Sequence, residues 1–375
     1  MHKKPWRYFI YGWMLILLAC TKPYEPPEVN TDIHLLVVDG FITCGTEATT
    51  TIFLSRSRKL TDSVINKPET GAQVQIEVEG GSHYPLQETV PGQYSSPPLS
   101  LNTNGVYRLR IIAANKEYVS DFIQGKQTPP IDSLNWKQEN DVRVFANTHD
   151  PQNNTRYYRW EFTETWEYHS FYDAYLEYRN GQIIFRDSAD HQKVCWSTAH
   201  STDILLGSSV NLTNDVIYQA PVALVPQGSS KLGNKYSIQV RQYALSEQAF
   251  NYWSILQKNT EQQGGLFDAQ PSQLVGNIRC ITDPGEIAIG YISASTVQEK
   301  RIYIKRSEVT NWTLTDPGPL CEPQFISPSQ ASIYLSDGLF APAYFVTGGG
   351  IAIARKECVD CTSRGGTNKK PSFWQ

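Results

Sequence analysis

Two cysteines near the carboxyl terminus, Cys358 and Cys361, have a spacing found in redox pairs, zinc sites and structural disulfides. A redox pair is expected between a strand and a helix of a βαβ unit, and a zinc ribbon needs a second pair at matching spacing. The segment around these cysteines is instead rich in Gly, Ser and Thr, and Cys321 stands alone upstream. We therefore expect disulfides that join Cys358 and Cys361 to each other or to Cys321.

The other cysteines are disulfide candidates for a related reason. The chain has seven cysteines, of which Cys20 belongs to an amino-terminal motif described below. The six that remain are an even number, which favours disulfides outside the cytoplasm. The candidates are Cys44, Cys195, Cys280, Cys321, Cys358 and Cys361. The sequence does not choose among their possible pairings.

The amino terminus has the pattern of a bacterial lipoprotein signal. Lys3, Lys4 and Arg7 form a basic region, and residues 10–18 form a short apolar run. The sequence Leu-Leu-Ala-Cys that ends at Cys20 resembles the lipobox, in which the cysteine thiol is acylated and becomes the mature amino terminus. A transmembrane anchor would need about 20 apolar residues, roughly twice the length of this run.

This motif predicts how the chain begins and where the mature protein lies. Residues 1–19 are predicted to be a signal peptide, and residues 20–32 a proline-rich tether. Removing the signal peptide leaves 33 − 3 = 30 basic residues and 37 acidic ones, a formal charge of −7. Such a charge argues against binding to nucleic acid or to an anionic membrane surface through a basic patch.

No catalytic or cofactor motif is recognised, so we predict no catalytic residue, no cofactor and no metal site. His191, Cys195 and His200 have spacings that a zinc site could use, but surface histidines around a disulfide-bonded cysteine explain them better. Glu164 is the sharpest catalytic candidate, because it lies on an apolar strand face. A buried pair with an arginine, or a strand end that reaches solvent, explains Glu164 without catalysis.

The elements that would position these residues are mainly β-strands. Residues 33–127 contain six or seven short strand patterns separated by turn residues, which predicts an immunoglobulin-like β-sandwich. Two prolines at positions 129 and 130 mark a boundary. Residues 131–375 are predicted to form a larger β-rich domain, with a long strand at 156–169 and one amphipathic helix from Ser246.

Aromatic residues supply the candidate contact surface. The chain has 21 Tyr and 9 Trp, and such side chains are common in binding interfaces. Tyr172, Tyr175 and Tyr178 lie around an expected hairpin and are the predicted contact residues. Phe373 and Trp374 at the carboxyl terminus are predicted to dock onto the second domain.

The order of several short motifs resembles a family of Bacteroidota lipoproteins of unknown function, the DUF4249-like proteins. The motifs include Val38-Asp39-Gly40-Phe41, Tyr158-Arg159-Trp160-Glu161-Phe162, Cys195-Trp196, and Lys370-Pro371-Ser372-Phe373-Trp374. The resemblance implies an outer-membrane lipoprotein with an amino-terminal immunoglobulin-like sandwich. It also implies a TonB-dependent receptor of the SusC-like type as partner, and it carries over no catalytic residue.

The leading hypothesis is therefore a non-enzymatic binding or accessory lipoprotein, anchored in the outer membrane and partnered with a TonB-dependent uptake receptor. A glycan- or peptide-acting hydrolase of the cell envelope and a structural or adhesion component are the alternatives. The ligand and the membrane face remain open.

Overall fold

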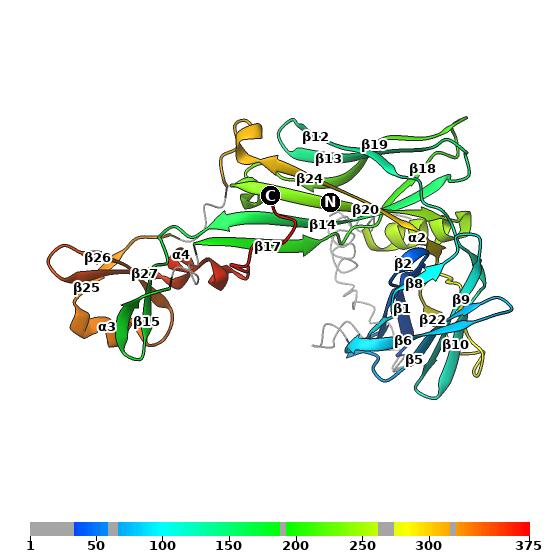
Figure 1. The fold of residues 1–375 in the computed structure, drawn as a ribbon, viewed down its shortest axis with the longest axis horizontal. Coiled ribbons are helices and arrows are strands. Elements are labelled where there is room, and N and C mark those ends of the chain that lie inside the picture. Colours follow the sequence, from blue (N-terminus) through cyan, green and yellow to red (C-terminus); the bar gives the residue numbers. More distant parts are fainter. Residues whose placement is uncertain (1–33, 59–66, 188–192, 262–273, 316–319) are drawn as a thin grey trace, which may run out of the picture. The chain divides into compact units, whose positions relative to one another are not determined.

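A computed structural model of the chain (Figure 1) describes residues 34–58, 67–187, 193–261, 274–315 and 320–375. Cys20, the signal peptide and the tether lie outside the described residues. Strands dominate, so the predicted mainly β fold class is confirmed. Among the described helices, none combines the length and the apolar composition that crossing a membrane requires.

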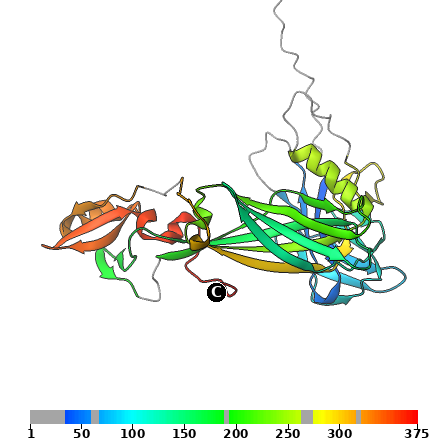
Figure 2. The same cartoon turned by 90° about the horizontal axis from the view of Figure 1, so that it is seen from above.

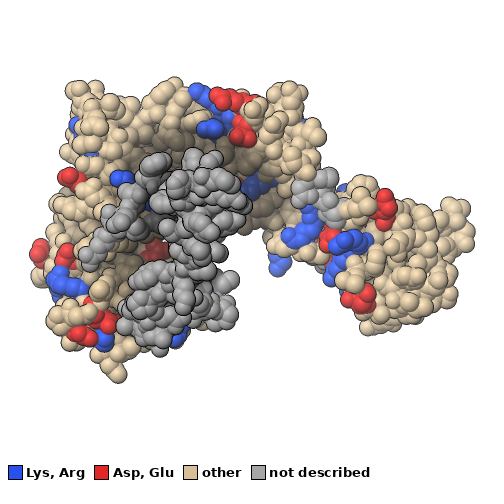
Figure 3. Space-filling model, turned by 180° about the vertical axis from the view of Figure 1, so that it is seen from behind, with Lys and Arg blue, Asp and Glu red and all other residues tan. Residues whose placement is uncertain are grey.

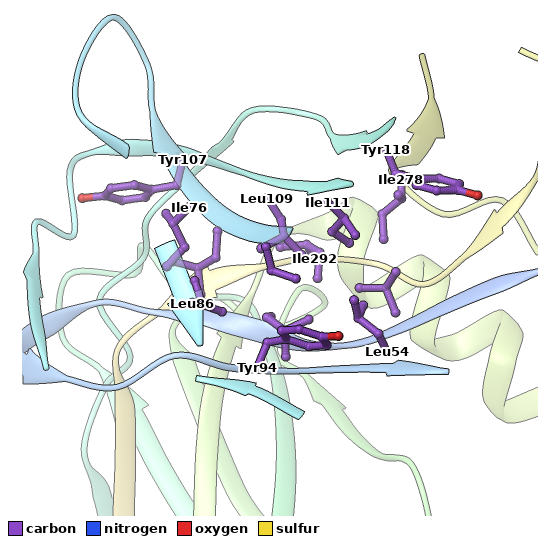
Figure 4. Packing of buried hydrophobic residues seen from close by; sticks show 14 of the residues in the cluster. Leu54, Ile76, Leu86, Tyr94, Tyr107, Leu109, Ile111, Tyr118, Ile278 and Ile292 are labelled. Atoms are coloured by element: carbon purple, nitrogen blue, oxygen red, sulfur yellow. The ribbon is translucent and has the colours of Figure 1, made fainter. Parts of the chain in front are cut away.

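The first sandwich is built from strands with alternating burial. In β9 (Val106–Ala113), every second residue is buried, from Tyr107 to Ala113, and β5 (Gln73–Val78) buries Val74 and Ile76 against it. Figure 4 shows Ile76, Leu109 and Ile111 in one core with Leu54, Tyr94 and Ile292. The remaining strands up to residue 127 are β1 (Leu36–Thr43), β2 (Gly45–Ala48), β3 (Thr51–Arg56), β4 (Lys67–Pro68), β6 (His83–Val90), β7 (Gln93–Ser95), β8 (Leu99–Leu101), β10 (Lys116–Ser120) and β11 (Ile123–Gln124).

Three short strands from much later in the chain complete this sandwich. β21 (Ile278–Cys280) pairs antiparallel with β10, while β22 (Ala288–Ile289) and β23 (Ala294–Ser295) pair in parallel with β1. Residues 286–294 are rich in apolar residues, and that pattern alone predicts a strand of the second domain. The structure differs because Gly290 adopts a φ of 145° between β22 and β23 and breaks the strand there. The sandwich is thus discontinuous in sequence, and Leu35–Gln375 form one compact unit.

A second pair of sheets packs face to face around its own core. The long strand predicted at 156–169 is β14 (Tyr157–His169), and its Tyr158 and Trp160 lie in that core. One sheet has the order β12 (Ile131–Gln138), β13 (Val142–Asp150), β19 (Asp215–Val225). The other has the order β17 (Val194–His200), β14, β20 (Lys235–Leu245), β24 (Val297–Lys305), with β18 (Leu205–Ser208) also paired to β14.

The predicted amphipathic helix is confirmed as α2 (Glu247–Glu261). Ser246 caps its amino terminus, because the Ser246 Oγ accepts a hydrogen bond from the Ala249 backbone N–H at 3.1 Å. Ala249 and Tyr252 are buried against the sheet, and the helix contacts β14, β18 and β20. Figure 2 shows the helix in yellow-green beside these strands.

A smaller lobe follows, which we define as residues 171–187 and 320–359 and call the C-terminal lobe. Its three-stranded sheet has β27 (Gly350–Arg355) between β25 (Gln324–Ile326) and β26 (Phe340–Val346), and a hairpin of β15 (Leu176–Arg179) and β16 (Gln182–Phe185) packs beside it. The helices of this end are α3 (Ala331–Leu335) and α4 (Lys356–Val359). The single-turn 3-10 helices of the chain are η2 (Ser230–Leu232), η3 (Arg306–Glu308), η4 (Pro328–Gln330) and η5 (Cys361–Arg364).

Two disulfides join this end of the chain. Cys358 pairs with Cys321, one of the alternatives expected from the sequence, whereas Cys361 pairs with Cys195 on β17. Cys361 therefore bonds neither of its expected partners, because η5 carries it away from Cys358 and against β14 and β17. The Tyr168 hydroxyl fixes this arrangement by donating to the Cys361 carbonyl at 2.9 Å.

The disulfide prediction is wrong for Cys44 and Cys280, which are free and buried. Both lie in the core of the first sandwich, where a thiol packs as a small apolar group. Cys44 follows β1 next to Ser295, while Cys280 sits on β21 opposite Tyr118, so their strands hold them in different parts of the sandwich. Burial raises the pKa of the Cys44 thiol to about 11, which keeps it protonated and unreactive.

Candidate binding surface

The predicted contact tyrosines lie on and beside the hairpin β15–β16. Asn180 and Gly181 form its two-residue turn with φ angles of 53° and 83°, as the mirror-image turns of tight hairpins require. The three tyrosines are only partly exposed. The Tyr172 hydroxyl donates to the Cys321 carbonyl at 2.8 Å, and Tyr178 packs on the small core around Ile326. These two tyrosines hold the lobe together, and Tyr175 lies closer to the surface contacts described next.

The most exposed aromatic side chains of the C-terminal lobe are phenylalanines that the sequence analysis did not select. They are Phe171, Phe185, Phe325 and Phe345, with exposed fractions of 70%, 71%, 65% and 49%. Phe185 contacts Phe345 edge to face, with ring centroids 5.8 Å apart, and stacks on Tyr175 at 6.4 Å. We call these three side chains, Tyr175, Phe185 and Phe345, the aromatic ridge.

Charge is unevenly distributed over the lobe: residues 171–187, which carry Tyr175 and Phe185, include five charged residues, whereas the segment that carries Phe345 has almost none. Asp337 is the only charged residue between Pro323 and Ala354, although charged residues make up 19% of the chain. Figure 3 shows mostly uncharged surface over this lobe on the face in view. Large exposed apolar surface without charge marks interaction sites in folded proteins. The segment around Phe345 therefore presents exposed apolar surface with little charge.

Close packing of small residues and cross-links hold this surface in place. Ala174, Ala343 and Ala354 form a buried cluster with Cys358 and Val359. Such a core is small, and the Cys321–Cys358 disulfide adds a covalent tie across it. The phenylalanines are thus presented on a cross-linked framework, which limits the entropy lost when a partner binds.

Glu164 lies away from this surface and is engaged by two partners. One carboxylate oxygen accepts a hydrogen bond from the Tyr236 hydroxyl at 2.9 Å, and the other is paired with the Lys231 ammonium group. The cation is therefore a lysine from η2, where the sequence analysis expected an arginine. Glu164 is therefore a buried carboxylate that is paired with a cation, which accounts for its place on an apolar strand face. Burial and the Glu164 carboxylate raise the pKa of Tyr236, which keeps its hydroxyl a hydrogen-bond donor.

The histidine–cysteine cluster does not meet as a metal site. Cys195 is consumed in a disulfide, and His191 lies outside the described residues. His200 Nδ1 lies 3.0 Å from the Thr163 hydroxyl on the outer face of β14. Within the ranges that the structure describes, no three potential ligands gather around a metal position.

The predicted docking of the carboxyl-terminal tail is confirmed. Trp374 is buried, and its indole N–H donates to Glu167 at 3.1 Å. The Arg301 guanidinium lies 3.7 Å from the centre of the Phe373 ring. Lys235 adds a second cation near Trp374, at 5.5 Å. The tail thus covers the outer face of β14, β20 and β24 with its own aromatic residues.

A signal for the missed phenylalanines was present in the sequence. A run of 32 residues with one charge, from Pro323 to Ala354, is too short of polar side chains to cover both faces of a small sheet. Because a three-stranded sheet with one helix has little core to fill, part of that apolar content must be exposed. The run therefore predicts an exposed apolar surface in this part of the chain. The contact between Phe185 and Phe345 could not be predicted, because it depends on how distant segments pack together.

Comparison with protein families gives one match. Residues 21–301 match the family described as "Domain of unknown function (DUF4249)", which is about three quarters of the chain. None of the curated proteins matches the chain significantly. The match covers the sandwich, α2 and most of the second pair of sheets, and it ends before β25–β27. On the extent of this match, the chain belongs to the DUF4249 family.

Proposed function

We propose that this protein is a non-enzymatic accessory lipoprotein, anchored in the outer membrane through Cys20, that docks on a TonB-dependent uptake receptor through its C-terminal lobe. The aromatic ridge of a cross-linked lobe, with Phe345 in a 32-residue segment that has one charged residue, is the observation that supports the docking part of this proposal. The lipobox that ends at Cys20 supports the anchor. The partner class rests on the family resemblance.

The physical case for a protein partner comes from what the ridge offers. Aromatic side chains lose little conformational entropy on binding and bury a large area, so a few of them carry most of the affinity of an interface. Phe185 and Phe345 are already in mutual contact, which spares part of their ordering cost. Because Asp337 is the one charged residue in the segment that carries Phe345, few charges of that segment must be stripped of water when it is covered, whereas Arg186 and Asp187 adjoin Phe185.

Co-purification from membranes in mild detergent tests the proposal. The tagged wild-type chain is expected to retain a TonB-dependent receptor, and Phe345→Ser is expected to weaken retention by about 2 kcal/mol or more, as for a central aromatic contact. Phe53→Ser is the matched control, because Phe53 lies on β3 of the first sandwich with a similar exposed fraction, 48% against 49%.

Four results decide between this proposal and its alternatives. Loss of the receptor with Phe345→Ser and retention with Phe53→Ser supports docking through the lobe. No receptor in any preparation contradicts the partner, and equal loss with both variants contradicts the surface. A deletion that leaves uptake intact but disturbs surface assembly favours the structural or adhesion alternative.

A further inference from the structure

A cavity of about 690 Å³ lies where β1, β14 and α2 meet, and none of the aromatic-ridge residues lines it. Its walls include Asp39 from β1, Arg159 from β14, and Trp253 from α2. Tyr291 from the loop after β22 closes a further side. The volume is in the range of small-molecule sites, which also combine aromatic walls with a few polar groups.

The Arg159 side chain supplies a positive charge in one wall of the cavity. The Arg159 guanidinium lies 3.7 Å from the centre of the Trp253 ring, a cation–π geometry. Tyr252 lies next to this ring, and its own ring is 5.2 Å from that of Tyr291. The three aromatic side chains therefore give the cavity a surface that suits a positive charge and an aliphatic stem.

The charge balance of the walls is negative. Arg159 Nη2 donates to Glu161 Oε1 at 2.6 Å, and Glu161 Oε2 accepts from the Tyr243 hydroxyl at 2.7 Å. This pair is internally neutral, which leaves the carboxylates of Asp39, Asp203 and Glu261 among the described lining residues. The cavity therefore offers more negative than positive charge to a ligand.

Asp39 is the carboxylate best placed to bind. Within the described parts of the chain, no side-chain cation is hydrogen-bonded to it. Desolvation raises the pKa of Asp39, with Arg159 opposing this rise and Glu161 adding to it. Burial and the Asp39 carboxylate also raise the pKa of Tyr252 to about 12, so the tyrosine stays a neutral neighbour. Asp39 is an exposed residue of β1, so a cation that enters the cavity can reach its carboxylate.

The backbone beside Asp39 is built for close approach. A Cβ at Gly290 would lie 2.2 Å from the Val38 carbonyl oxygen, and Gly290 has a φ that other residues rarely adopt. Only glycine lets the loop that carries Tyr291 lie directly against β1. The Asp39 wall and the Tyr291 wall are thus held together by the core strands on which they sit.

We infer that this cavity binds the primary ammonium group of a small organic molecule or peptide side chain, with Asp39 as the anionic partner and Tyr252, Trp253 and Tyr291 around its aliphatic stem. The inference concerns a different part of the chain from the aromatic ridge and does not depend on a receptor. Free diamines and lysine side chains share this chemistry, so the test includes both.

Calorimetric titration of the purified full chain with cadaverine, and separately with the amino-terminally acetylated peptide Ala-Lys-Ala, whose only ammonium group is the lysine side chain, tests the inference. Binding of cadaverine alone identifies a free amine, and binding of the peptide identifies a lysine side chain. Asp39→Asn is expected to weaken binding by about tenfold or more, the loss typical of one charge-assisted hydrogen bond. Asp337→Asn, which removes the same charge from the C-terminal lobe, is expected to change nothing.

The result that overturns the inference is equally direct. If neither amine binds at millimolar concentration, or if Asp39→Asn and Asp337→Asn bind alike, the cavity is not an ammonium site. Binding of calcium in place of both amines also overturns it. Circular dichroism of each variant confirms the fold, and Asp39→Glu, which keeps the charge, is expected to retain more affinity than Asp39→Asn.

Discussion

The first sandwich and the C-terminal lobe are stabilised in different ways. The sandwich buries a continuous apolar core from nine or more strands, keeps its two cysteines as free thiols, and turns its charges outward. Lys116 and Asp283, for example, form an ion pair at 3.0 Å, with their side chains 34% and 48% exposed. The lobe has two small cores, a disulfide and one charged residue from Pro323 to Ala354.

This difference indicates a division of labour. A domain that only needs to fold can place charged residues on its surface, which keeps it apart from other chains. Between Pro323 and Ala354 the lobe has only one charged residue, and it exposes phenylalanines on a cross-linked framework. Such a surface is costly in water unless it is covered by a partner, so we assign recognition to the lobe and support to the sandwich.

The disulfide of the lobe is expected to give the largest effect on stability. Cys358→Ser opens a loop of 37 residues, and the loop-entropy model assigns about 4 kcal/mol to such a cross-link. Limited proteolysis with mass spectrometry should show cleavage within the lobe and protection of the sandwich. Cys280→Ser, in the sandwich, is the control and should leave the digestion pattern unchanged. Cleavage that begins in the sandwich would remove the contrast between the two regions.

The sandwich core is expected to give the next largest effect. Ile76 is fully buried between β-strands, so Ile76→Ala should destabilise the chain by about 3 kcal/mol through lost packing and a cavity. Urea unfolding followed by tryptophan fluorescence measures the change. Receptor retention below the melting temperature should not change, since the ridge lies elsewhere. A variant that folds normally but loses the receptor would show that the sandwich also takes part in recognition.

Loss of the Glu164–Lys231 ion pair is expected to have the third largest effect on stability. Glu164→Gln keeps the shape of the side chain but leaves the Lys231 ammonium group without its carboxylate. We expect a loss of about 2 kcal/mol, because a charged hydrogen-bond partner is removed while Lys231 still reaches solvent. Thermal unfolding measures it, with Glu299→Gln on the exposed side of β24 as control. Unchanged stability would mean that the pair contributes nothing.

The smallest expected effect is a difference in acid sensitivity. The Lys116 ammonium holds the pKa values of Glu286 and Asp283 below their usual range. A lowered folded-state pKa contributes stability that is present above the unfolded value and lost as pH falls through the folded value. β10 and the segment after β21 should therefore loosen in acid before β26 and β27 do.

Hydrogen exchange, corrected for its intrinsic pH dependence, can compare these segments at about pH 6 and about pH 3.5. The lobe is the internal control, because Asp337 is its one acidic group from Pro323 to Ala354. Equal loosening of both regions would show that the ion pairs of Lys116 do not set the difference.

Individual strands and the helix α2 could be predicted from the sequence, whereas the way in which distant segments pack together could not. The alternation around β14 and the helical spacing after Ser246 are local patterns, and both elements formed where expected. The return of residues 278–295 to the first sandwich has no local signal, because short strands such as β22 are defined by their partner on β1. The Cys321–Cys358 bond was among the expected pairings. The Cys195–Cys361 bond and the free state of Cys44 and Cys280 were not predicted, since they depend on which strands become neighbours.

The candidate surface was predicted in part. The predicted contact tyrosines lie on the lobe that carries the aromatic ridge, but Tyr172 and Tyr178 are partly buried supports. Phe345 lies far along the chain from Phe185, and their contact exists only because β26 and the β15–β16 hairpin pack together. Exposure of an aromatic side chain is a property of the whole fold, which a single strand pattern does not reveal.

Site-specific photo-crosslinking in intact cells tests the division of labour most directly. A photoreactive phenylalanine analogue is placed at Phe345 in the lobe or at Phe53 in the sandwich, two positions of nearly equal exposure. The account predicts an adduct with an outer-membrane receptor from position 345 and none from position 53. A receptor adduct from position 53 alone, or from neither position, would contradict it.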